Sequence, residues 1–285
     1  MNRVAVATSA GDDVDPDARL LLDALRDAQI EGQLCVWGDE RVDWNGFDLV
    51  VIRSTWDYTA QRESYLTWAR GIERLWNPFP VIEYSTDKHY LLDLERRGHR
   101  IVPTTLCDVG AVPRFPDVDF VVKPAVGAGS RNAEKYRAHE RDRAVAHVAR
   151  LHALGRDVVI QPYVGAVDTL GERALVFIDG AFSHAMTKGA MLNVTELDRN
   201  ALFRIEQMSV AHAEPDALGL ANAVLAEDLF EGLLYARVDL VCTDDGWAVM
   251  ELELVEPSLF LWYDEEAPRR LARAIRRRLA ASTNV

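Results

Sequence analysis

The residues with the most suggestive chemistry lie close together near the C-terminus. Glu251 and Glu253 are separated by one residue, and Asp239 precedes Glu251 by twelve positions. Polar and apolar residues alternate on both sides of the Asp-Asp-Gly sequence at 244–246, which predicts a β-hairpin. A three-residue loop with its glycine in the left-handed conformation places Asp239 opposite Glu251 and Arg237 opposite Glu253.

In this register three carboxylates and one arginine share a face of the hairpin. Carboxylates this close repel one another, so the cluster requires a cation. Oxygen ligands of this kind suit Mg²⁺, which takes one or two carboxylates and completes its shell with water and phosphate oxygens. Two alternatives remain: a register shifted by one residue turns Asp239 into the apolar layer, and a plain half-exposed strand also alternates polar and apolar residues.

The elements that must position these residues begin with an α/β pattern. We expect strands at 4–7, 34–36 and 49–52, a helix that starts at Asp15-Pro16, and a second helix over 62–76. An alternation of strands and helices predicts a parallel sheet. The proline-rich stretch at 77–80 marks the end of this first lobe.

Two further pieces follow that boundary. The first has an expected helix at 88–97, strands at 120–123 and 158–161, and a helix over 141–154 between them. The second has antiparallel strands at 173–178 and 181–187, the acidic hairpin, and a helix over 268–279. The fold class predicted is therefore α/β, with α+β lobes after the first.

The composition restricts the partners. The chain has 285 residues, 49% of them hydrophobic, and a net charge of −13, which argues against a nucleic acid or an anionic membrane as partner. Its three cysteines are far apart in the sequence and favour buried thiols in a reducing compartment. We expect a cytoplasmic protein, because the apolar start is too short for a signal peptide and no stretch approaches the roughly 18 apolar residues of a membrane span.

Two segments contain residues suited to a nucleotide. Lys123 ends an expected strand and is followed by the small residues of the loop at 127–130, where backbone N–H groups could approach a polyphosphate. The segment at 161–164 ends another strand, and its exposed backbone groups could hydrogen-bond an adenine edge. The alternatives are a plain turn for the first segment and an interlobe linker for the second. Lys188, on a later strand, could equally be a surface lysine.

Taken in order, these features resemble the ATP-grasp superfamily. The resemblance spans residues 86–263 and rests on six short motifs, which the family has in the same order. They are Thr86-Asp87-Lys88, Val122-Lys123-Pro124, Gln161-Pro162-Tyr163-Val164, Gly171-Glu172, Arg237-Val238-Asp239 and Glu251-Leu252-Glu253.

Within that superfamily the chain most resembles the cyclo-ligases of D-cycloserine biosynthesis, which act on O-ureido-D-serine. This closer resemblance covers nearly the whole chain and rests on residues 52–58, 77–78, 87–94, 102–104, 183–188 and 251–257. It implies an N-terminal α/β domain at 1–85 for the substrate, a small lobe at 86–165, and a C-terminal lobe at 166–285 with the metal site. The two lobes would clamp ATP between antiparallel sheets.

The resemblance also implies a role for each matching residue. Lys88 and Lys123 would contact the phosphates of ATP, and Gly127, Ala128, Gly129 and Ser130 would cover them. Gln161, Pro162, Tyr163 and Val164 would form the hinge that binds adenine, and Glu172 would hold the ribose. Asp239, Glu251 and Glu253 would bind one or two Mg²⁺ ions, or Mn²⁺. Lys188 and Arg237 would act catalytically, beside the γ-phosphate and the transferred phosphoryl group.

The substrate contacts are expected where the first lobe faces the metal site. Arg53, Ser54, Thr55 and Asp57 follow the carboxyl end of an expected strand, which is the usual ligand edge of an α/β sheet. Arg53 could bind a carboxylate, and Asp57 or Glu256 could bind an amino group. The alternative for Arg53 is a structural ion pair.

The function implied is an ATP-dependent carbon–nitrogen ligase. A substrate carboxylate would attack the γ-phosphate, and a nitrogen would capture the acyl phosphate, most simply by cyclisation of O-ureido-D-serine to D-cycloserine. One alternative is an intermolecular ligase that joins an amino acid to an amine or peptide. Another is a nucleotide-binding module without turnover, which the intact set of acidic residues argues against. Relatives of this kind suggest a possible homo-oligomer.

Overall fold

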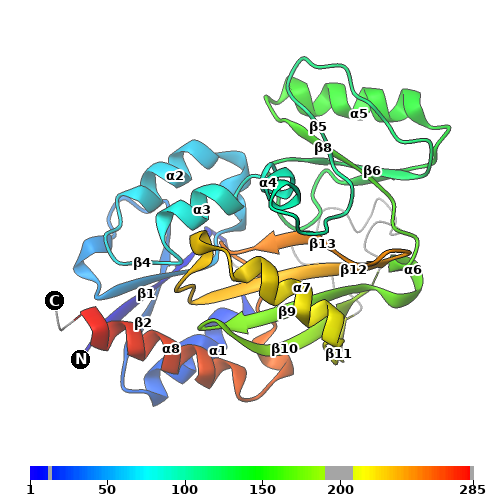
Figure 1. Ribbon diagram of the computed structural model, residues 1–285. Coiled ribbons are helices and arrows are strands. Elements are labelled where there is room, and N and C mark those ends of the chain that lie inside the picture. Colours follow the sequence, from blue (N-terminus) through cyan, green and yellow to red (C-terminus); the bar gives the residue numbers. More distant parts are fainter. Residues whose placement is uncertain (12–14, 190–207, 283–285) are drawn as a thin grey trace.

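The computed structural model of the protein describes residues 1–11, 15–189 and 208–282. Its strands form three sheets that follow one another along the chain (Figure 1). The boundaries expected at residues 85 and 165 fall between these sheets, and the division into three domains stays a prediction. Within the described residues, no helix is long and apolar enough to span a membrane.

The first sheet is parallel, as predicted, and has the strand order β2-β1-β3-β4. The strands are β1 (Arg3–Thr8), β2 (Glu31–Val36), β3 (Leu49–Ser54) and β4 (Leu75–Trp76), and the helices among them are α1 (Pro16–Asp27) and α2 (Arg62–Arg70). The prediction that the second helix reaches residue 76 is wrong. Gly71 caps α2, and Leu75 pairs with Val50 as the start of a fourth strand.

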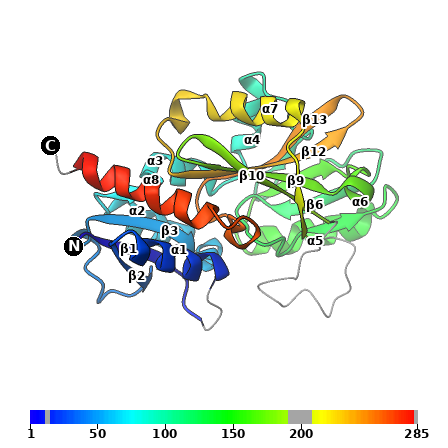
Figure 2. The same cartoon turned by 90° about the horizontal axis from the view of Figure 1, so that it is seen from below.

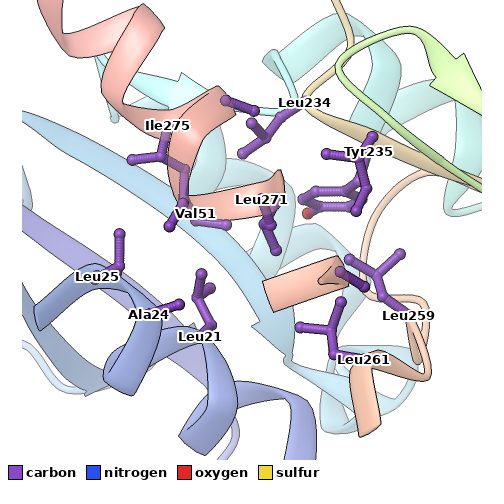
Figure 3. Packing of buried hydrophobic residues seen from close by; sticks show 14 of the residues in the cluster. Leu21, Ala24, Leu25, Val51, Leu234, Tyr235, Leu259, Leu261, Leu271 and Ile275 are labelled. Carbon is purple, nitrogen blue, oxygen red and sulfur yellow. The ribbon is translucent and has the colours of Figure 1, made fainter. Parts of the chain in front are cut away.

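Helices α1 and α8 (Ala267–Ser282) cover one face of this sheet. Helix α1 begins where Asp15 accepts a hydrogen bond from the backbone N–H of Asp17 at 3.0 Å, with proline at the first helical position. Figure 3 shows Leu21 of α1 and Leu271 of α8 packed in one core with Val51 of β3. The same core contains residues of the third sheet, so α8 joins the first lobe to the last.

The second sheet is antiparallel, with the order β5-β8-β6-β7, and is covered by α5. Its strands are β5 (Thr105–Cys107), β6 (Phe120–Pro124), β7 (Glu134–Tyr136) and β8 (Val158–Pro162), and its helix is α5 (Arg141–Ala153). Two helices precede it, α3 (Phe79–Ser85) and α4 (Tyr90–Arg96). The sequence analysis missed α3, because its prolines look like a boundary although a proline is tolerated in a first helical turn.

The third sheet is antiparallel and has five strands in the order β11-β10-β9-β12-β13. They are β9 (Glu172–Ile178), β10 (Ala181–Lys188), β11 (Met208–Ala211), β12 (Tyr235–Thr243) and β13 (Gly246–Glu253), with the helices α6 (Val167–Leu170) and α7 (Pro215–Leu225) nearby. Alternate residues of β9 face different cores: Val176 packs toward α1 and α8, and Phe177 packs toward α4 and α7. Figure 2 shows α7 lying over this second face.

In the acidic hairpin of β12 and β13 the functional residues pair as predicted, but the loop length and the strand geometry beside it differ from the prediction. Asp239 lies opposite Glu251, and Arg237 lies opposite Glu253, as expected. The loop, however, has two residues instead of three, because Thr243 pairs with Gly246. A bulge beside Leu240 restores the register, since Leu240 pairs with Val249 and Met250 is the extra residue. Bulges of this kind redirect side chains next to active sites.

Candidate active site

One large cavity, of about 790 Å³, collects most of the predicted site residues. Its walls come from the second and third sheets, from helix α1 and the turn after β3 in the first lobe, and from the segment that follows β13. A volume of this size is typical of a site for a small ligand. The predicted residues that line it are Lys88, Lys123, Gly127, Ala128, Gly129, Ser130, Gln161, Pro162, Tyr163, Val164, Glu172, Lys188, Arg237, Glu251, Glu253 and Glu256.

Two lysines from the small lobe approach the acidic hairpin. Lys123, at the end of β6, places its Nζ 2.7 Å from Oε1 of Glu251, and the Nζ of Lys88 lies 3.9 Å from the same oxygen. Lys88 also donates a hydrogen bond of 2.9 Å to the carbonyl of Gly127, at the start of the small-residue loop. Both predicted phosphate-binding lysines therefore converge on one carboxylate of the third sheet.

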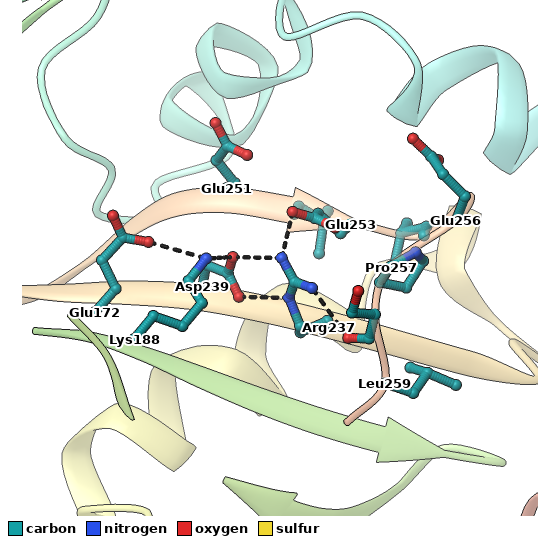
Figure 4. A network of polar contacts seen from close by, with 12 residues as sticks. Glu172, Lys188, Arg237, Asp239, Glu251, Glu253, Glu256, Pro257 and Leu259 are labelled. Carbon is teal, nitrogen blue, oxygen red and sulfur yellow. Dashed lines mark hydrogen bonds and ion pairs between the residues drawn. The ribbon is translucent and has the colours of Figure 1, made fainter. Parts of the chain in front are cut away.

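A second ion-pair group lies on the floor of the cavity (Figure 4). Lys188 lies 2.6 Å from Asp239 and 3.0 Å from Glu172, which is its direct neighbour across β9 and β10. Arg237 donates two hydrogen bonds to Asp239, of 2.8 and 2.9 Å, and a third to Glu253. A forked arginine–carboxylate contact of this kind holds both side chains in fixed orientations.

The predicted metal ligands are not assembled around one point. Asp239 is fully buried, it is absent from the cavity wall, and its oxygens are occupied by Lys188 and Arg237. Among the described residues, the acidic and histidine side chains whose ligand atoms all lie within 4.8 Å of one another are His89, Asp108 and Asp157, which lie outside this cavity. That Asp239, Glu251 and Glu253 bind one or two Mg²⁺ ions stays a prediction, in which Asp239 would have to exchange its contacts with Lys188 and Arg237 for the metal.

The pKa values show where the site has excess charge. Burial opposes ionisation of Glu251, but Lys123 and Lys88 outweigh it and hold the pKa of that carboxyl well below its usual range. Burial raises the pKa of Glu253 to about 7, and the nearby Asp239 and Glu251 add to the effect. Burial, followed by the repulsion from Glu253, raises the pKa of Glu256 to about 8. Nearby cations therefore neutralise the carboxyl groups of Glu253 and Glu256 less completely than that of Glu251.

These residues fit Mg²⁺ together with a triphosphate. Four cationic side chains are paired with four carboxylates, Lys88 and Lys123 with Glu251, Lys188 with Glu172 and Asp239, and Arg237 with Asp239 and Glu253. Phosphates that bind the lysines would leave the carboxylates without partners. Divalent cations on Glu251 and Glu253 would replace the lost charge, and Mg²⁺ needs only one or two protein carboxylates.

The predicted hinge, residues 161–164, also lines the cavity. Gln161 is buried and donates a hydrogen bond of 2.9 Å to the hydroxyl of Thr104. The wall around it is apolar, with Val121, Val164, Val167 and Met250, the bulge residue, among its members. A flat aromatic base would be buried well between such side chains.

The small-residue loop is linked to the first lobe. Arg131, directly after the loop, donates a hydrogen bond of 3.2 Å to the carbonyl of Trp56. Trp56 begins a short helical turn at Trp56–Ala60, and its indole N–H donates to the carbonyl of Glu256 at 3.2 Å. The loop, the first lobe and the segment after β13 are therefore connected around the cavity.

Gly171, just before Glu172, is required by the backbone. Its φ is +69°, and a Cβ at this position would lie 2.5 Å from the carbonyl oxygen of Lys188. We expect Gly171→Ala to lose about 1–3 kcal/mol of folding stability and about 100-fold in activity, because the added carbon displaces Lys188. Thermal unfolding and steady-state ADP release measure the two effects.

Gly180 provides the matched control for this substitution. It lies at the other end of β9, has a φ of +75°, and has no atom within 4 Å of an added Cβ. Gly180→Ala should therefore destabilise the protein through its backbone alone, by about 1–2 kcal/mol, and leave ADP release unchanged. Equal losses of activity in the two variants would contradict the role given to Lys188.

The structure does not bring the predicted substrate residues of the first lobe to the cavity. Arg53, Ser54 and Thr55 are fully buried and absent from its walls. Ser54 lies 2.8 Å from the hydroxyl of Thr8, Thr55 lies 2.9 Å from that of Tyr65, and Asp57 accepts from the indole of Trp37 at 2.7 Å. None of these four residues lines the cavity, so the structure does not support a direct contact with the substrate, and that contact stays a prediction.

Arg53 instead holds the segment that follows β13, residues 254–261. It donates a hydrogen bond of 2.6 Å to the carbonyl of Pro257 and lies 3.5 Å from Asp17. Asp17 in turn accepts the backbone N–H groups of Leu259, Phe260 and Leu261, at 2.6, 3.0 and 2.6 Å. This ion pair therefore acts on the site indirectly, by fixing the backbone beside Glu256.

Every carbonyl from 254 to 259 accepts a side-chain hydrogen bond. The donors, in chain order of the carbonyls, are Asn77, Tyr235, Trp56, Arg53, Arg237 and His184, at distances between 2.6 and 3.2 Å. They come from the first lobe and from the third sheet. The sequence analysis missed this arrangement, because no local pattern relates these donors to an irregular segment.

Aromatic residues at the cavity were also missed. Trp56, Tyr58, Tyr90, Trp262 and Tyr263 line it. Trp262 is 42% exposed, which is unusual for a large aromatic side chain that has only a packing role. Its position a few residues after Glu256 is the signal that could have indicated it.

The chain is similar to proteins of known identity over its whole length. A family model described as the N-terminal domain of D-cycloserine synthetase DcsG matches residues 4–77. The cycloserine biosynthesis protein DcsG of Streptomyces lavendulae is 40% identical over 288 residues, which cover 93% of this chain and 95% of that protein.

Comparison with solved structures shows similarity to the same protein and to a further ligase. The crystal structure of D-cycloserine synthetase DcsG has 35% sequence identity and a TM-score of 0.86, and the match covers 98% of this chain and all of that one, 100%. The D-alanine–D-alanine ligase of Bacillus anthracis, solved with ATP, has a TM-score of 0.70 at 14% identity, over 99% of this chain and 98% of that one. The second match shows the fold alone.

Proposed function

Because this chain belongs to the ATP-grasp ligases, in the family of the cycloserine biosynthesis protein DcsG, we propose that it activates a small amino-acid carboxylate with ATP. The carboxylate becomes an acyl phosphate, and a nitrogen nucleophile captures it. The reaction favoured is the cyclisation of O-ureido-D-serine to D-cycloserine. Residues 86–165 and 166–285 would bind ATP between them, and residues 1–85 would close the substrate end of the cavity.

The observation that carries this proposal is the convergence of four cationic side chains on the acidic hairpin. Lys88 and Lys123 approach from the small lobe, and Lys188 and Arg237 lie on the floor formed by the third sheet. This is the charge that a triphosphate requires, placed between two antiparallel sheets. Mg²⁺ held by Glu251 and Glu253 would neutralise charge on the phosphate oxygens during transfer.

In the first step a carboxylate oxygen of the substrate forms a bond to the γ-phosphorus, and the bond to the ADP oxygen breaks. Lys188 and Arg237 lie at the floor of the cavity, where they can stabilise the charge on the transferred group. Asp239 does not react. Its oxygens hold Lys188 and Arg237 in position through contacts of 2.6 and 2.8 Å.

In the second step the nitrogen bound to oxygen in the ureido group attacks the acyl carbon. The new carbon–nitrogen bond closes a five-membered ring, phosphate leaves with the electrons of the carbon–oxygen bond, and the nitrogen loses its proton. Water then removes the carbamoyl group as CO₂ and ammonia. The chain supplies mainly orientation here, since holding the two ends of one molecule together can lower a barrier by about 7–11 kcal/mol.

An assay of ADP release against a panel of acids tests this function. We expect O-ureido-D-serine to stimulate ADP formation when no second amino acid is added to the assay. The product should have the mass of D-cycloserine. A product that contains two acids would instead favour the intermolecular ligase. If ATP raises the melting temperature but no acid stimulates ADP formation, the chain is a nucleotide-binding module and the proposal fails.

A further inference from the structure

The strand that carries Glu251 and Glu253 lies at the edge of its sheet (Figure 4). Strand β13 pairs with β12 on one side, and no strand among the described residues pairs with its other side. An edge strand presents N–H and C=O groups that need other partners. The backbone groups of Leu252, between the two acidic residues, point to this open edge.

Three side chains take the place of a strand at this edge. The hydroxyl of Tyr90 accepts the N–H of Leu252 at 2.9 Å, and the hydroxyl of Ser85 donates to the carbonyl of Leu252 at 3.0 Å. Ser85 also accepts the N–H of Leu254 at 3.3 Å. Asn77 donates to the carbonyl of Leu254 at 2.7 Å. Each backbone group of Leu252 and Leu254 therefore has a side-chain partner here.

Nearer the hairpin loop the same edge has ordinary backbone contacts. Val249 donates to the carbonyl of Arg100 at 2.9 Å and accepts the N–H of Val102 at 2.9 Å. Side chains replace such contacts at the part of β13 that carries the two acidic residues. Because a hydroxyl can reach the strand from the end of a helix, the chain there need not run extended along β13.

The two hydroxyls lie on either side of Lys88 in the sequence. Ser85 is the last residue of α3, Tyr90 is the first residue of α4, and both line the cavity. The Nζ of Lys88, between them, lies 3.9 Å from Oε1 of Glu251. The segment with this lysine is therefore attached to the strand with the acidic residues at two points. Tyr90 and Leu252 are both buried, so water would not replace a lost contact.

We propose that Tyr90 and Ser85 are positioning residues, which fix the spacing between Lys88 and the carboxylates of β13 for a metal-bound triphosphate. The inference rests on the proposed function and adds two residues that act through the backbone of β13. Without these hydroxyls, the lysine segment and the strand can shift against each other. Glu251 and Glu253 would then meet the metal at altered distances. Partners outside the ligand shell of a metal commonly change its affinity by about 10- to 100-fold.

The experiment measures by calorimetry the Kd of a non-hydrolysable ATP analogue, once with excess Mg²⁺ and once with EDTA. The ratio of the two Kd values is the factor by which the metal tightens binding. Tyr90→Phe removes one hydroxyl and keeps the ring, and we expect this factor to fall about 10-fold in the variant. The Kd with EDTA should stay within about threefold of that of the unaltered protein, because the hinge and the other cations are untouched. A general loss of structure would instead weaken binding under both conditions.

Tyr84→Phe is the matched control. Tyr84 lies six residues before Tyr90, and the centroids of the two rings are 5.8 Å apart. Its hydroxyl donates to Asp93 at 3.0 Å and lies 3.5 Å from the carbonyl of Tyr90, so neither contact reaches β13. The control variant loses a comparable hydroxyl from the same part of the fold and should keep the full effect of Mg²⁺. Ser85→Ala should reduce that effect as Tyr90→Phe does.

A metal effect that falls in Tyr90→Phe and survives in Tyr84→Phe supports the positioning role. A metal effect within about threefold of the unaltered protein's in folded Tyr90→Phe overturns it. An equal loss in Tyr84→Phe also overturns it, as does an unaltered protein that binds the analogue no better with Mg²⁺. If Tyr90→Phe fails to fold, Ser85→Ala decides by the same threshold. These measurements use no acid substrate, so a protein that binds nucleotide and Mg²⁺ but forms no ADP with any acid contradicts the proposed function alone.

Discussion

Glu251→Gln is expected to lower kcat by at least about 1,000-fold while the protein remains folded. The carboxylate of Glu251 contacts Lys123 at 2.7 Å and lies 3.9 Å from Lys88, and it faces the cavity where Mg²⁺ would bind. The amide keeps the volume but removes the charge that positions both lysines and the metal. Single-turnover ADP formation with O-ureido-D-serine, measured across a range of Mg²⁺ concentrations, gives the size of the loss.

The hairpin that carries Glu251 also provides the control. Asp244 lies at the exposed tip of the same hairpin. Asp244→Asn removes the same charge at a distance from the cavity and should leave kcat and the Mg²⁺ requirement unchanged. If Glu251→Gln turns over at a rate within tenfold of the unaltered protein, the carboxylate is not a metal ligand and the charge argument for this cavity is wrong.

Arg237→Ala is expected to lose both activity and stability. We expect a fall in kcat of about 1,000-fold, because a cation beside the transferred phosphoryl group is lost. We also expect a fall of about 3–5 kcal/mol in the free energy of unfolding, because the buried Asp239 loses a forked partner. Denaturant unfolding and ADP release measure the two losses on the same preparation.

The two losses can be separated at Asp239. Adding Asp239→Asn to Arg237→Ala removes the unpaired buried charge and should restore part of the stability, without restoring activity. Arg237→Lys keeps a charge but cannot make the forked contact, so it should recover more stability than activity. If Arg237→Ala proves as stable as the unaltered protein, the ion pair does not hold the floor of the cavity and the proposed role of Asp239 fails.

The overall fold could be predicted because its evidence is spread over the chain. The motifs around Lys88, Lys123, Gln161 and Glu251 predicted an ATP-grasp fold from their order in the sequence, and the similarity to solved ATP-grasp structures confirms that fold. The long periodic elements, such as β1, α1, α5 and β12, were found within a few residues of their bounds. The strands β4, β5 and β7 were missed because a segment of two or three residues is too short to show a hydrophobic periodicity.

The site was predicted best where residues act through strand pairing. Asp239 and Glu251 are opposite one another as expected, although the loop was one residue too long and a bulge at Met250 compensated. Alternation fixes which face a residue takes, but it does not reveal a bulge. The position of Arg53 away from the cavity wall has another cause. A strand end predicts proximity to a ligand, whereas the buried Asp17 and the carbonyl of Pro257 that engage Arg53 come from distant parts of the sequence.

The central claim is that a carboxylate of the substrate attacks the γ-phosphate of ATP in this cavity. The direct test is to label both carboxylate oxygens of O-ureido-D-serine with the heavy isotope of oxygen and to analyse the phosphate released during turnover. An acyl phosphate leaves one labelled oxygen in the phosphate, so labelled phosphate should form in proportion to product. Product that forms together with unlabelled phosphate would contradict the claim.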